Sequence, residues 1–347
     1  MNAIPKRNGG LFNIKAVLGI VISLVGLYLG FRKFDAAEFL EALRSTRLLM
    51  FGVAMLVMVF QVFLRALRWR YLILPLQSAA LKHVFGAQMV CYFGNHVFPL
   101  RFGEILRSYA LNQATGIPAV AIFGTVVIER VLDMTFFLII LPLTVLTFFP
   151  VGPEWLRWSG GAAVGLLLLL IVAFLIFRRN RTNIARYLNR KLTGTRYEKL
   201  LQPLRNFSQG LATLRETPHL GLIALITLVI WVVSILNVWV AGLAVNISLG
   251  FANLLLLFFV TSAIIAVPSA PGYVGTYHAG AIGVLLYMGY ELSQAQVTAV
   301  ILHAVGFISL TLIGFFYFMR YHLHVSDTAV VNYQSQRDSL SKRNWID

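Results

Sequence analysis

Apolar stretches recur along the whole chain, and each is long enough, or nearly long enough, to cross a lipid bilayer as a helix. Crossing the hydrocarbon layer takes about 20 helical residues, and the connections between the stretches leave no large polar block for a separate domain. The pattern predicts an all-α polytopic membrane protein. The eight predicted spans cover residues 14–31, 48–64, about 118–149, 159–177, about 220–243, 251–267, 276–290 and 295–319.

The spans are expected to form one membrane domain over residues 1–325, followed by a polar tail at 326–347. A basic connector at 178–218 separates a first half, about 14–177, from a second half, about 219–319. The domain is therefore expected to consist of two helical halves joined on one side of the membrane.

Basic residues favour the cytoplasmic side of a membrane and set the expected orientation. Arg65, Arg68 and Arg70 follow the second span, and the connector is rich in arginine. Both belong in the cytoplasm, so an even number of spans places both chain termini there. Arg32 and Lys33 directly follow the first span, where a signal peptide would have a cleavage pattern of small residues, so we expect a retained helix.

One segment of the first half does not fit a simple span. The apolar run at 84–97 is short and is broken at Asn95, Pro99 and Gly103, although both of its flanks belong in the cytoplasm. We therefore expect residues 81–111 to form a re-entrant pair of helices. Broken backbone at membrane depth needs hydrogen-bond partners from protein or from a water-filled cavity, so the break predicts a central cavity.

A second interruption lies in the other half, between two spans of about 17 and 15 residues. Its residues are Pro268, Ser269, Ala270, Pro271, Gly272, Tyr273, Val274 and Gly275, and Thr276 begins the next span. Paired breaks in the two halves of a chain are typical of a transporter's binding site. The backbone of both breaks is therefore expected to line that site. The alternative is a cytoplasmic loop of ordinary turn residues.

Composition agrees with a membrane protein, because 59% of the residues are hydrophobic, only 12% are charged and the mean hydropathy is +0.78. The net charge of +16 could indicate nucleic-acid binding, but the basic residues lie between apolar spans. Their placement follows from membrane topology, with attraction to anionic headgroups as a consequence. We expect no nucleic-acid partner. The single cysteine, Cys91, excludes an intramolecular disulfide.

Charged residues inside apolar segments are the candidate chemistry, because such groups are costly in a membrane and are usually paired or functional. Arg101, Glu104 and Arg107 are spaced three apart, so Glu104 can pair with either arginine on one helix face. The alternative to an anionic headgroup site is a salt-bridged helix at the interface.

A second charged group, Glu129, Arg130 and Asp133, is expected inside the third span. The uncharged run that follows Asp133 is too short to cross the membrane alone, so these residues enter the membrane with it. Glu129 and Asp133 share a helix face, and Arg130 is expected to reach Asp133 or the arginines of the first group. With Asn95, the two groups form the predicted headgroup site. A purely structural ion-pair cluster is the alternative.

No nucleotide-binding loop, zinc-protease signature or nucleophile elbow is recognised, so the sequence favours a transporter over an enzyme. His278 and His303 stand alone in the sequence, and we expect packed or hydrogen-bonded helix residues there rather than metal ligands. No cofactor is predicted.

Three ordered motifs carry a family resemblance. They are Asn95, Pro99, Arg101, Gly103, Glu104 and Arg107 in the first, Glu129, Arg130 and Asp133 in the second, and Pro268 to Thr276 in the third. Together they resemble the flippase-like family that includes the transmembrane region of lysylphosphatidylglycerol synthase proteins. The resemblance implies a helical membrane domain with re-entrant segments that is associated with moving a lipid between leaflets. It also implies that aminoacyl transfer belongs to a separate soluble domain. This chain ends at Asp347 without one, so synthase activity is not expected.

We therefore expect a translocator in a prokaryotic inner membrane that moves an anionic phospholipid or a polyprenyl-phosphate lipid between leaflets. Membrane lipids are its expected partners, and an envelope lipid-synthesis enzyme is a further candidate partner. One alternative is a membrane-embedded transferase acting on such lipids, with Glu129, Asp133 or Glu104 as general base. The other is a scaffold subunit of an envelope lipid enzyme.

Overall fold

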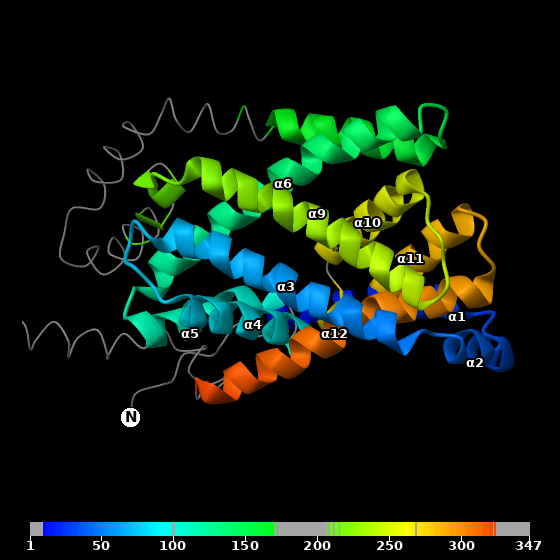
Figure 1. Ribbon diagram of the computed structural model, residues 1–347, viewed down its shortest axis with the longest axis horizontal. Coiled ribbons are helices and arrows are strands. Elements are labelled where there is room, and N and C mark those ends of the chain that lie inside the picture. The colour runs from blue at the N-terminus through cyan, green and yellow to red at the C-terminus, as the bar shows by residue number, and fades with distance from the viewer. Residues whose placement is uncertain are drawn as a thin grey trace, which may run out of the picture.

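A computed structural model describes residues 10–98, 101–169, 216–267 and 269–321, together with residues 172, 206, 209–210, 212–214 and 323. Every regular element in this part of the chain is helical (Figure 1), so the predicted all-α class is confirmed. The elements are α1 (Gly10–Phe31), α2 (Ala36–Arg44), α3 (Leu48–Ile73), α4 (Leu81–Val97), α5 (Gly103–Thr115), α6 (Ala119–Phe148), α9 (Leu220–Ala244), α10 (Phe251–Ala266), the short 3-10 helix η2 (Pro271–Tyr273), α11 (Thr276–Tyr287) and α12 (Leu292–Arg320). A further helix covers 154–169.

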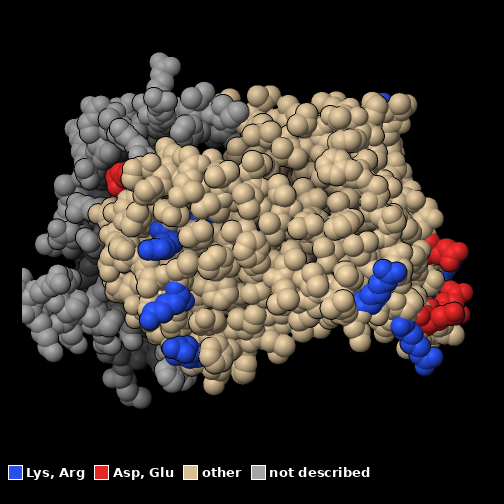
Figure 2. Space-filling view, in the orientation of Figure 1, with Lys and Arg blue, Asp and Glu red and all other residues tan. Residues whose placement is uncertain are grey.

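Four of the described helices, α3, α6, α9 and α12, are long and apolar enough to cross a membrane alone. A fifth candidate is the pair of α1 and α2, which are bent by 87° at the break between them. On the face shown in Figure 2, charged side chains gather near the two ends of the molecule and leave a broad uncharged belt between them. Such a belt fits the hydrocarbon layer of a bilayer. Most of the predicted connector at 178–218, and the whole tail at 326–347, lie outside the described residues.

α4 and α5 form a helix hairpin around the first predicted break. Oδ1 of Asn95, near the end of α4, accepts a hydrogen bond from the Gly103 amide at 3.0 Å, which fixes the first turn of α5. Gly103 also lets the two helices touch, because a Cβ there would overlap the Cys91 carbonyl oxygen. At the base, Gln77 Nε2 donates to the Thr115 carbonyl at 3.3 Å, so the two ends of the hairpin lie together. The two helices thus form the predicted pair, and its entry and exit on one side of the membrane stay a prediction.

α10 and α11 form a second hairpin, with η2 at its tip. The two helices pack closely because Gly280 in α11 has no side chain where Ile264 of α10 lies. The tip reaches the middle of α12, where Nε2 of His303 and the carbonyl oxygen of Gly272 are 2.7 Å apart. The second break therefore lies inside the bundle and is not a loop at its end.

This second hairpin corrects the predicted topology. The sequence pattern predicts two separate crossings here, over 251–267 and 276–290, but the tip that joins the two helices lies against His303 in the middle of α12. The outer ends of both helices lie together at one end of the bundle, where the Tyr290 hydroxyl donates to the Ser248 carbonyl at 3.1 Å. Among the described residues, four helices, or five with the bent pair of α1 and α2, are long and apolar enough to cross a membrane. The predicted count of eight is therefore loose, because hydropathy cannot distinguish a short span from one arm of a hairpin.

The two hairpins enter the bundle from opposite ends (Figure 1). Ala244, just before the second hairpin, accepts a hydrogen bond from the Arg47 amide at 2.7 Å, which places that hairpin's base beside the start of α3. The base of the first hairpin lies at the other end of α3, where Arg70 Nε donates to the Ala79 carbonyl at 3.1 Å. Their tips therefore point toward each other.

α1 presents small residues to the second hairpin. A Cβ on Gly26 would lie 2.9 Å from the carbonyl oxygen of Gly275, so only glycine permits this approach. One turn earlier, the hydroxyl of Ser23 accepts a hydrogen bond from the Ala270 amide at 2.8 Å. The broken segment is thus held against the side of α1 by close backbone contact.

Candidate functional site

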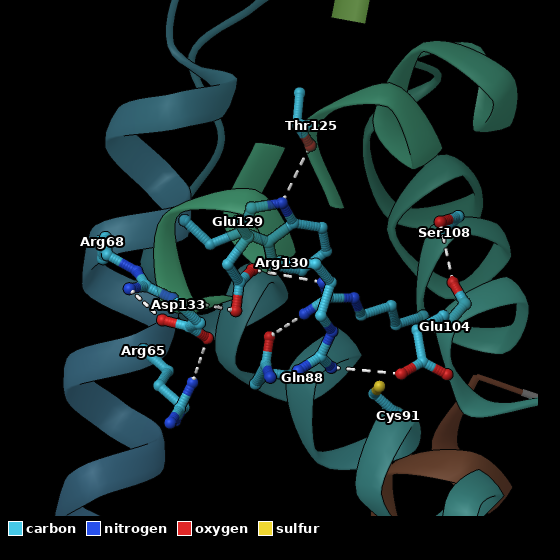
Figure 3. Close-up of polar contacts among 12 residues, drawn as sticks. Arg65, Arg68, Gln88, Cys91, Glu104, Ser108, Thr125, Glu129, Arg130 and Asp133 are labelled. Carbon is cyan, nitrogen blue, oxygen red and sulfur yellow. Dashed lines mark hydrogen bonds and ion pairs between the residues drawn. The ribbon is translucent and has the colours of Figure 1, made fainter. Parts of the chain in front are cut away.

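Seven charged side chains from three helices lie together in five ion pairs, here termed the charged cluster (Figure 3). They are Arg65 and Arg68 on α3, Glu104 and Arg107 on α5, and Glu129, Arg130 and Asp133 on α6. Four arginines face three carboxylates, so the cluster carries one excess positive charge. It joins the first hairpin to two long helices.

Glu129 is the centre of the charged cluster. Its carboxylate oxygens lie 3.3 Å from Arg68 Nη2 and 3.2 Å from Arg107 Nη2, and all three side chains are fully buried. Arg107 is also held by Gln88, whose Oε1 accepts a hydrogen bond from Nη1 at 2.5 Å. Its guanidinium carbon is 4.6 Å from the ring centroid of Trp69. Opposite charges at this distance offset part of the cost of burying each of them in a membrane.

Asp133 extends the cluster by about one helical turn. It accepts hydrogen bonds from Arg65 Nη1 at 2.8 Å and from Arg68 Nη1 at 2.6 Å. Because Asp133 follows Glu129 by four residues on α6, Arg68 can contact both carboxylates. The predicted shared face of the two acids is confirmed.

Glu104 and Arg130 link the first hairpin to α6. Nη2 of Arg130 lies 3.1 Å from Oε1 of Glu104, and Nδ2 of Asn95 donates to the same oxygen at 3.5 Å. The second carboxylate oxygen of Glu104, Oε2, is buried and has no hydrogen-bond partner among the described residues. The Arg130 side chain is 43% exposed, the largest exposure in the cluster. Arg130 is therefore the arginine of the cluster that an outside molecule reaches most readily.

The structure changes the predicted pairing of the first charged group. Glu104 pairs with Arg130 rather than with Arg101 or Arg107. The reason is geometric: α5 begins at Gly103, so Arg101 lies before the helix, and Arg107 is directed into the bundle toward Glu129.

Sequence reasoning missed two members of the cluster, Arg65 and Arg68. It assigns both to the cytoplasmic flank of the second span, but α3 continues to Ile73 and carries them into the bundle. They bond Asp133, which the sequence pairs with Arg130. Their spacing of three residues, which keeps both on one helix face, is the signal that could have found them.

The tips of the two hairpins meet in the tip junction, which consists of Arg101, Tyr273, His96 and Phe307. The guanidinium carbon of Arg101, an exposed residue, is 5.6 Å from the ring centroid of Tyr273 in η2. The Tyr273 ring lies edge-on to His96 near the end of α4, with centroids 6.4 Å apart. His96 in turn stacks on Phe307 of α12, with centroids 5.1 Å apart. α4, η2 and α12, together with Arg101 two residues before α5, therefore converge here.

The backbone at the tip junction adopts left-handed conformations. Arg101 has a φ of 54°, Gly272 one of 70° and Tyr273 one of 60°. For a residue with a side chain this region costs of the order of 1–3 kcal/mol, and such strain tends to gather at functional sites. The strain at Arg101 and Tyr273 therefore coincides with the point where the hairpins touch.

The predicted cavity-backbone residues fall into separate groups. Ser269, Pro271, Gly272, Gly275 and Thr276 lie in or beside the tip of the second hairpin, and Gly103 closes the first. Pro99 and Pro268 lie outside the described residues. The cavity itself stays a prediction.

The sequence predicts that the backbone groups of the second break are free to line a site. In the structure, side chains form hydrogen bonds with several of these groups. The Gly272 carbonyl contacts His303 Nε2 at 2.7 Å, and the Gly275 amide donates to His278 Nδ1 at 3.4 Å. A Cβ added at Gly272 would lie 2.7 Å from the ring of Phe307, so the ring leaves no room for a larger residue at this position. These side chains thus supply part of the hydrogen bonds that water would otherwise have to supply to the broken backbone.

His278 and His303 are hydrogen-bonded helix residues, as predicted, but they are not alone. Their ring centroids are 4.8 Å apart. In the part of the chain that the structure describes, no group of three or more His, Cys, Asp or Glu side chains is arranged to hold a metal ion.

Comparisons with known proteins point to one family. The family model described as the lysylphosphatidylglycerol synthase TM region matches residues 16–314. A UPF0104 membrane protein of Methanothermobacter thermautotrophicus is 23% identical, over 86% of this chain and 89% of its own length. A UPF0104 membrane protein of Methanocaldococcus jannaschii is 25% identical, over 64% of this chain and 91% of its own length.

A third similarity is partial. Glycosyltransferase AglD of Haloferax volcanii is 26% identical over 35% of this chain and 20% of its own length. No solved structure matches the chain. Because the family model covers most of the sequence, including both breaks and the charged cluster, this protein belongs to the family of the lysylphosphatidylglycerol synthase transmembrane region.

Proposed function

We propose that this protein moves a lipid with an anionic, phosphate-bearing headgroup between the leaflets of a prokaryotic plasma membrane. The observation that carries the proposal is the meeting of two hairpins from opposite ends of the bundle, with Arg101 and Arg130 beside their tips. Broken helices that meet inside the membrane are typical of secondary transporters, whose substrate binds near the midplane.

The charge balance favours an anion. The charged cluster has one excess positive charge, and Arg101 adds another beside it. Arg101 is exposed and Arg130 is half-exposed, whereas Arg68 and Arg107 are fully buried. A phosphate between the two accessible guanidiniums would accept charge-assisted hydrogen bonds from both.

The buried members of the cluster would support binding without touching the lipid. Arg68, Arg107 and Glu129 tie α3, α5 and α6 together, so they hold Arg130 in place beside the tip of the first hairpin. The headgroup would enter from one leaflet while its acyl chains stay in lipid. Movement of the hairpins against the long helices would then open the site to the other leaflet, in an alternating-access scheme.

Lipid movement can be tested in vesicles. Purified protein is reconstituted with fluorescent phosphatidylglycerol or fluorescent phosphatidylcholine, and an impermeant reductant then bleaches the probe in the outer leaflet. We expect the bleached fraction of phosphatidylglycerol to pass beyond the outer-leaflet share only when protein is present, and phosphatidylcholine to respond less. Equal bleaching in protein-containing and protein-free vesicles would contradict the proposal.

The partial similarity to a glycosyltransferase favours one other candidate, a transferase that uses a polyprenyl-phosphate or phospholipid. Glu104 would then be the general base, because among the described residues it forms an ion pair with one arginine, Arg130. Glu129 and Asp133 fit this role less well, since each contacts two arginines. Incubation with nucleotide-sugar donors and lipid, followed by mass spectrometry, separates the candidates: an enzyme yields a new lipid, and a translocator changes only its sidedness.

A further inference from the structure

Three histidines gather around the tip of the second hairpin, namely His96 of the tip junction and the two histidines behind it, and none of them is among the arginines proposed to bind the headgroup. His278 in α11 and His303 in α12 have ring centroids 4.8 Å apart, and His278 is only 7% exposed. The ring of Phe307 stacks on His303 at 5.4 Å and on His96 of α4 at 5.1 Å. Ionisable residues inside a membrane bundle often mark proton pathways, and histidine is the side chain that changes charge near neutral pH.

Hydrogen bonds indicate which nitrogen of each ring carries the proton. The carbonyl of Gly272 can only accept, so His303 donates from Nε2 and its Nδ1 is the nitrogen that takes up a proton. The amide of Gly275 can only donate, so His278 accepts at Nδ1. A proton on His303 would strengthen its bond to the hairpin tip, whereas a proton on Nδ1 of His278 would displace the Gly275 amide.

Among the described residues, no carboxylate is found next to the pair. The titratable or charged groups that face it are Tyr277 on α11, His96 on α4, Tyr273 in η2 and, beyond Tyr273, Arg101. α1 contributes the ring of Phe31. No histidine among the described residues forms an ion pair with a carboxylate. Two protonated rings at this separation would repel each other, so we expect the pair to hold at most one proton.

We infer that His278 and His303 form a proton site whose occupancy is linked to binding of an anionic headgroup at the adjoining tip junction. The inference rests on the proposed function for the nature of the anion. The phosphate supplies the counter-charge that the histidines lack, and the proton helps to offset the phosphate charge inside the membrane. Because linkage is reciprocal, lipid binding takes up a proton and becomes tighter as the pH falls.

The test counts protons directly. Purified protein in a neutral detergent is titrated with dihexanoyl phosphatidylglycerol by calorimetry, in two buffers that differ in ionisation enthalpy. The difference in heat gives the protons exchanged on binding, and we expect an uptake of up to about one proton per lipid near neutral pH. Affinity should be about fivefold or more higher at about pH 5.5 than at about pH 8. Equal heats in the two buffers would overturn the inference.

A conservative variant assigns the proton to the pair. In the double variant His278→Asn, His303→Gln, the amide oxygen of Asn replaces Nδ1 as acceptor and the amide nitrogen of Gln replaces Nε2 as donor. It should bind lipid without taking up a proton, and unchanged uptake would overturn the inference. The matched control is His219→Gln, at the start of α9 against Tyr71, which should keep the wild-type uptake. If the double variant does not fold, the heats measured with the wild-type protein in the two buffers still decide whether lipid binding takes up a proton.

Transport separates this inference from the proposed function. Lipid movement in vesicles should become about fivefold faster or more when a proton gradient points along the direction of movement. Proton uptake without lipid movement supports the proton site and overturns the translocator. Lipid movement without proton uptake or gradient dependence overturns the proton site and leaves the translocator standing. Absence of lipid binding at every pH overturns both.

Discussion

Nη2 of Arg130 on α6 lies 3.1 Å from Oε1 of Glu104 in the first turn of α5. This ion pair joins the tip of the first hairpin to the helix that carries Glu129 and Asp133. It is also where the buried cluster becomes accessible, because Arg130 is half-exposed. Oε2 of Glu104 has no hydrogen-bond partner among the described residues, so a third group can join the pair without breaking it.

The Glu104 and Arg130 pair should show strong coupling in stability. Arg130→Gln alone leaves Glu104 without its arginine and should cost about 1–2 kcal/mol, because the site is partly exposed. The double variant Glu104→Gln, Arg130→Gln removes both charges and should recover most of that loss. Melting temperatures of the wild type, of Glu104→Gln, of Arg130→Gln and of the double variant measure the coupling. A double variant less stable than the single one would show that the two residues do not act as a pair.

Removing the central carboxylate should be much more costly. Glu129→Gln leaves Arg68 and Arg107 fully buried with less compensation, which should cost about 3–5 kcal/mol. The matched control is Glu154→Gln, at an exposed position of the helix at 154–169, and it should change stability little. Thermal unfolding of both variants in detergent provides the comparison. Equal melting temperatures would mean that the cluster does not hold the helices together.

The first hairpin should tolerate no side chain at Gly103. A Cβ there would overlap the Cys91 carbonyl oxygen and crowd Asn95, so Gly103→Ala should open the hairpin and lower the yield of folded protein. Gly161→Ala is the control, because nothing lies within 4 Å of the added Cβ and alanine favours a helix. Size-exclusion profiles after purification report the outcome. A normal profile for Gly103→Ala would argue against the close contact of α4 and α5.

Labelling from the two sides of the membrane tests the opposed hairpins. Gln77→Cys and Gln113→Cys flank the first hairpin at exposed positions, and both should react with an impermeant thiol reagent from the same side. Glu291→Cys, after the second hairpin, should react from the other side. The native thiol of Cys91 is buried and should stay silent. Reaction of Gln77→Cys and Gln113→Cys from opposite sides would show that the first hairpin crosses the membrane.

The sequence was enough to predict the helical membrane class and both breaks, because apolar length and Gly or Pro positions are local signals. The first break is predicted to be re-entrant because basic residues flank both of its ends. The second has no such flanks, so hydropathy alone gave two crossings there. The position of the second break inside the bundle depends on contacts between residues far apart in the chain, such as Ser23 with Ala270 and His303 with Gly272.

The charged cluster was predicted in part for a similar reason. Glu129 and Asp133 were found because both lie in an apolar span and share a helix face. Arg65 and Arg68 were missed because they follow an apolar run, where topology also places arginine. Ion-pair partners on different helices are set by tertiary packing, which no spacing within one helix reveals. Arg107 illustrates this, since it pairs with Glu129 rather than with its own helix.

The central claim is that accessible arginines beside the hairpin tips bind the headgroup that moves. Its most direct test is the translocation rate of fluorescent phosphatidylglycerol in vesicles that contain Arg101→Gln or the charge-balanced Glu104→Gln, Arg130→Gln variant. Arg157→Gln, at an exposed position outside the cluster, is the control. The account predicts that both site variants fold but slow translocation by about tenfold or more, because each charge-assisted hydrogen bond contributes about 1.5–3 kcal/mol. Rates equal to those of Arg157→Gln in both variants would contradict it.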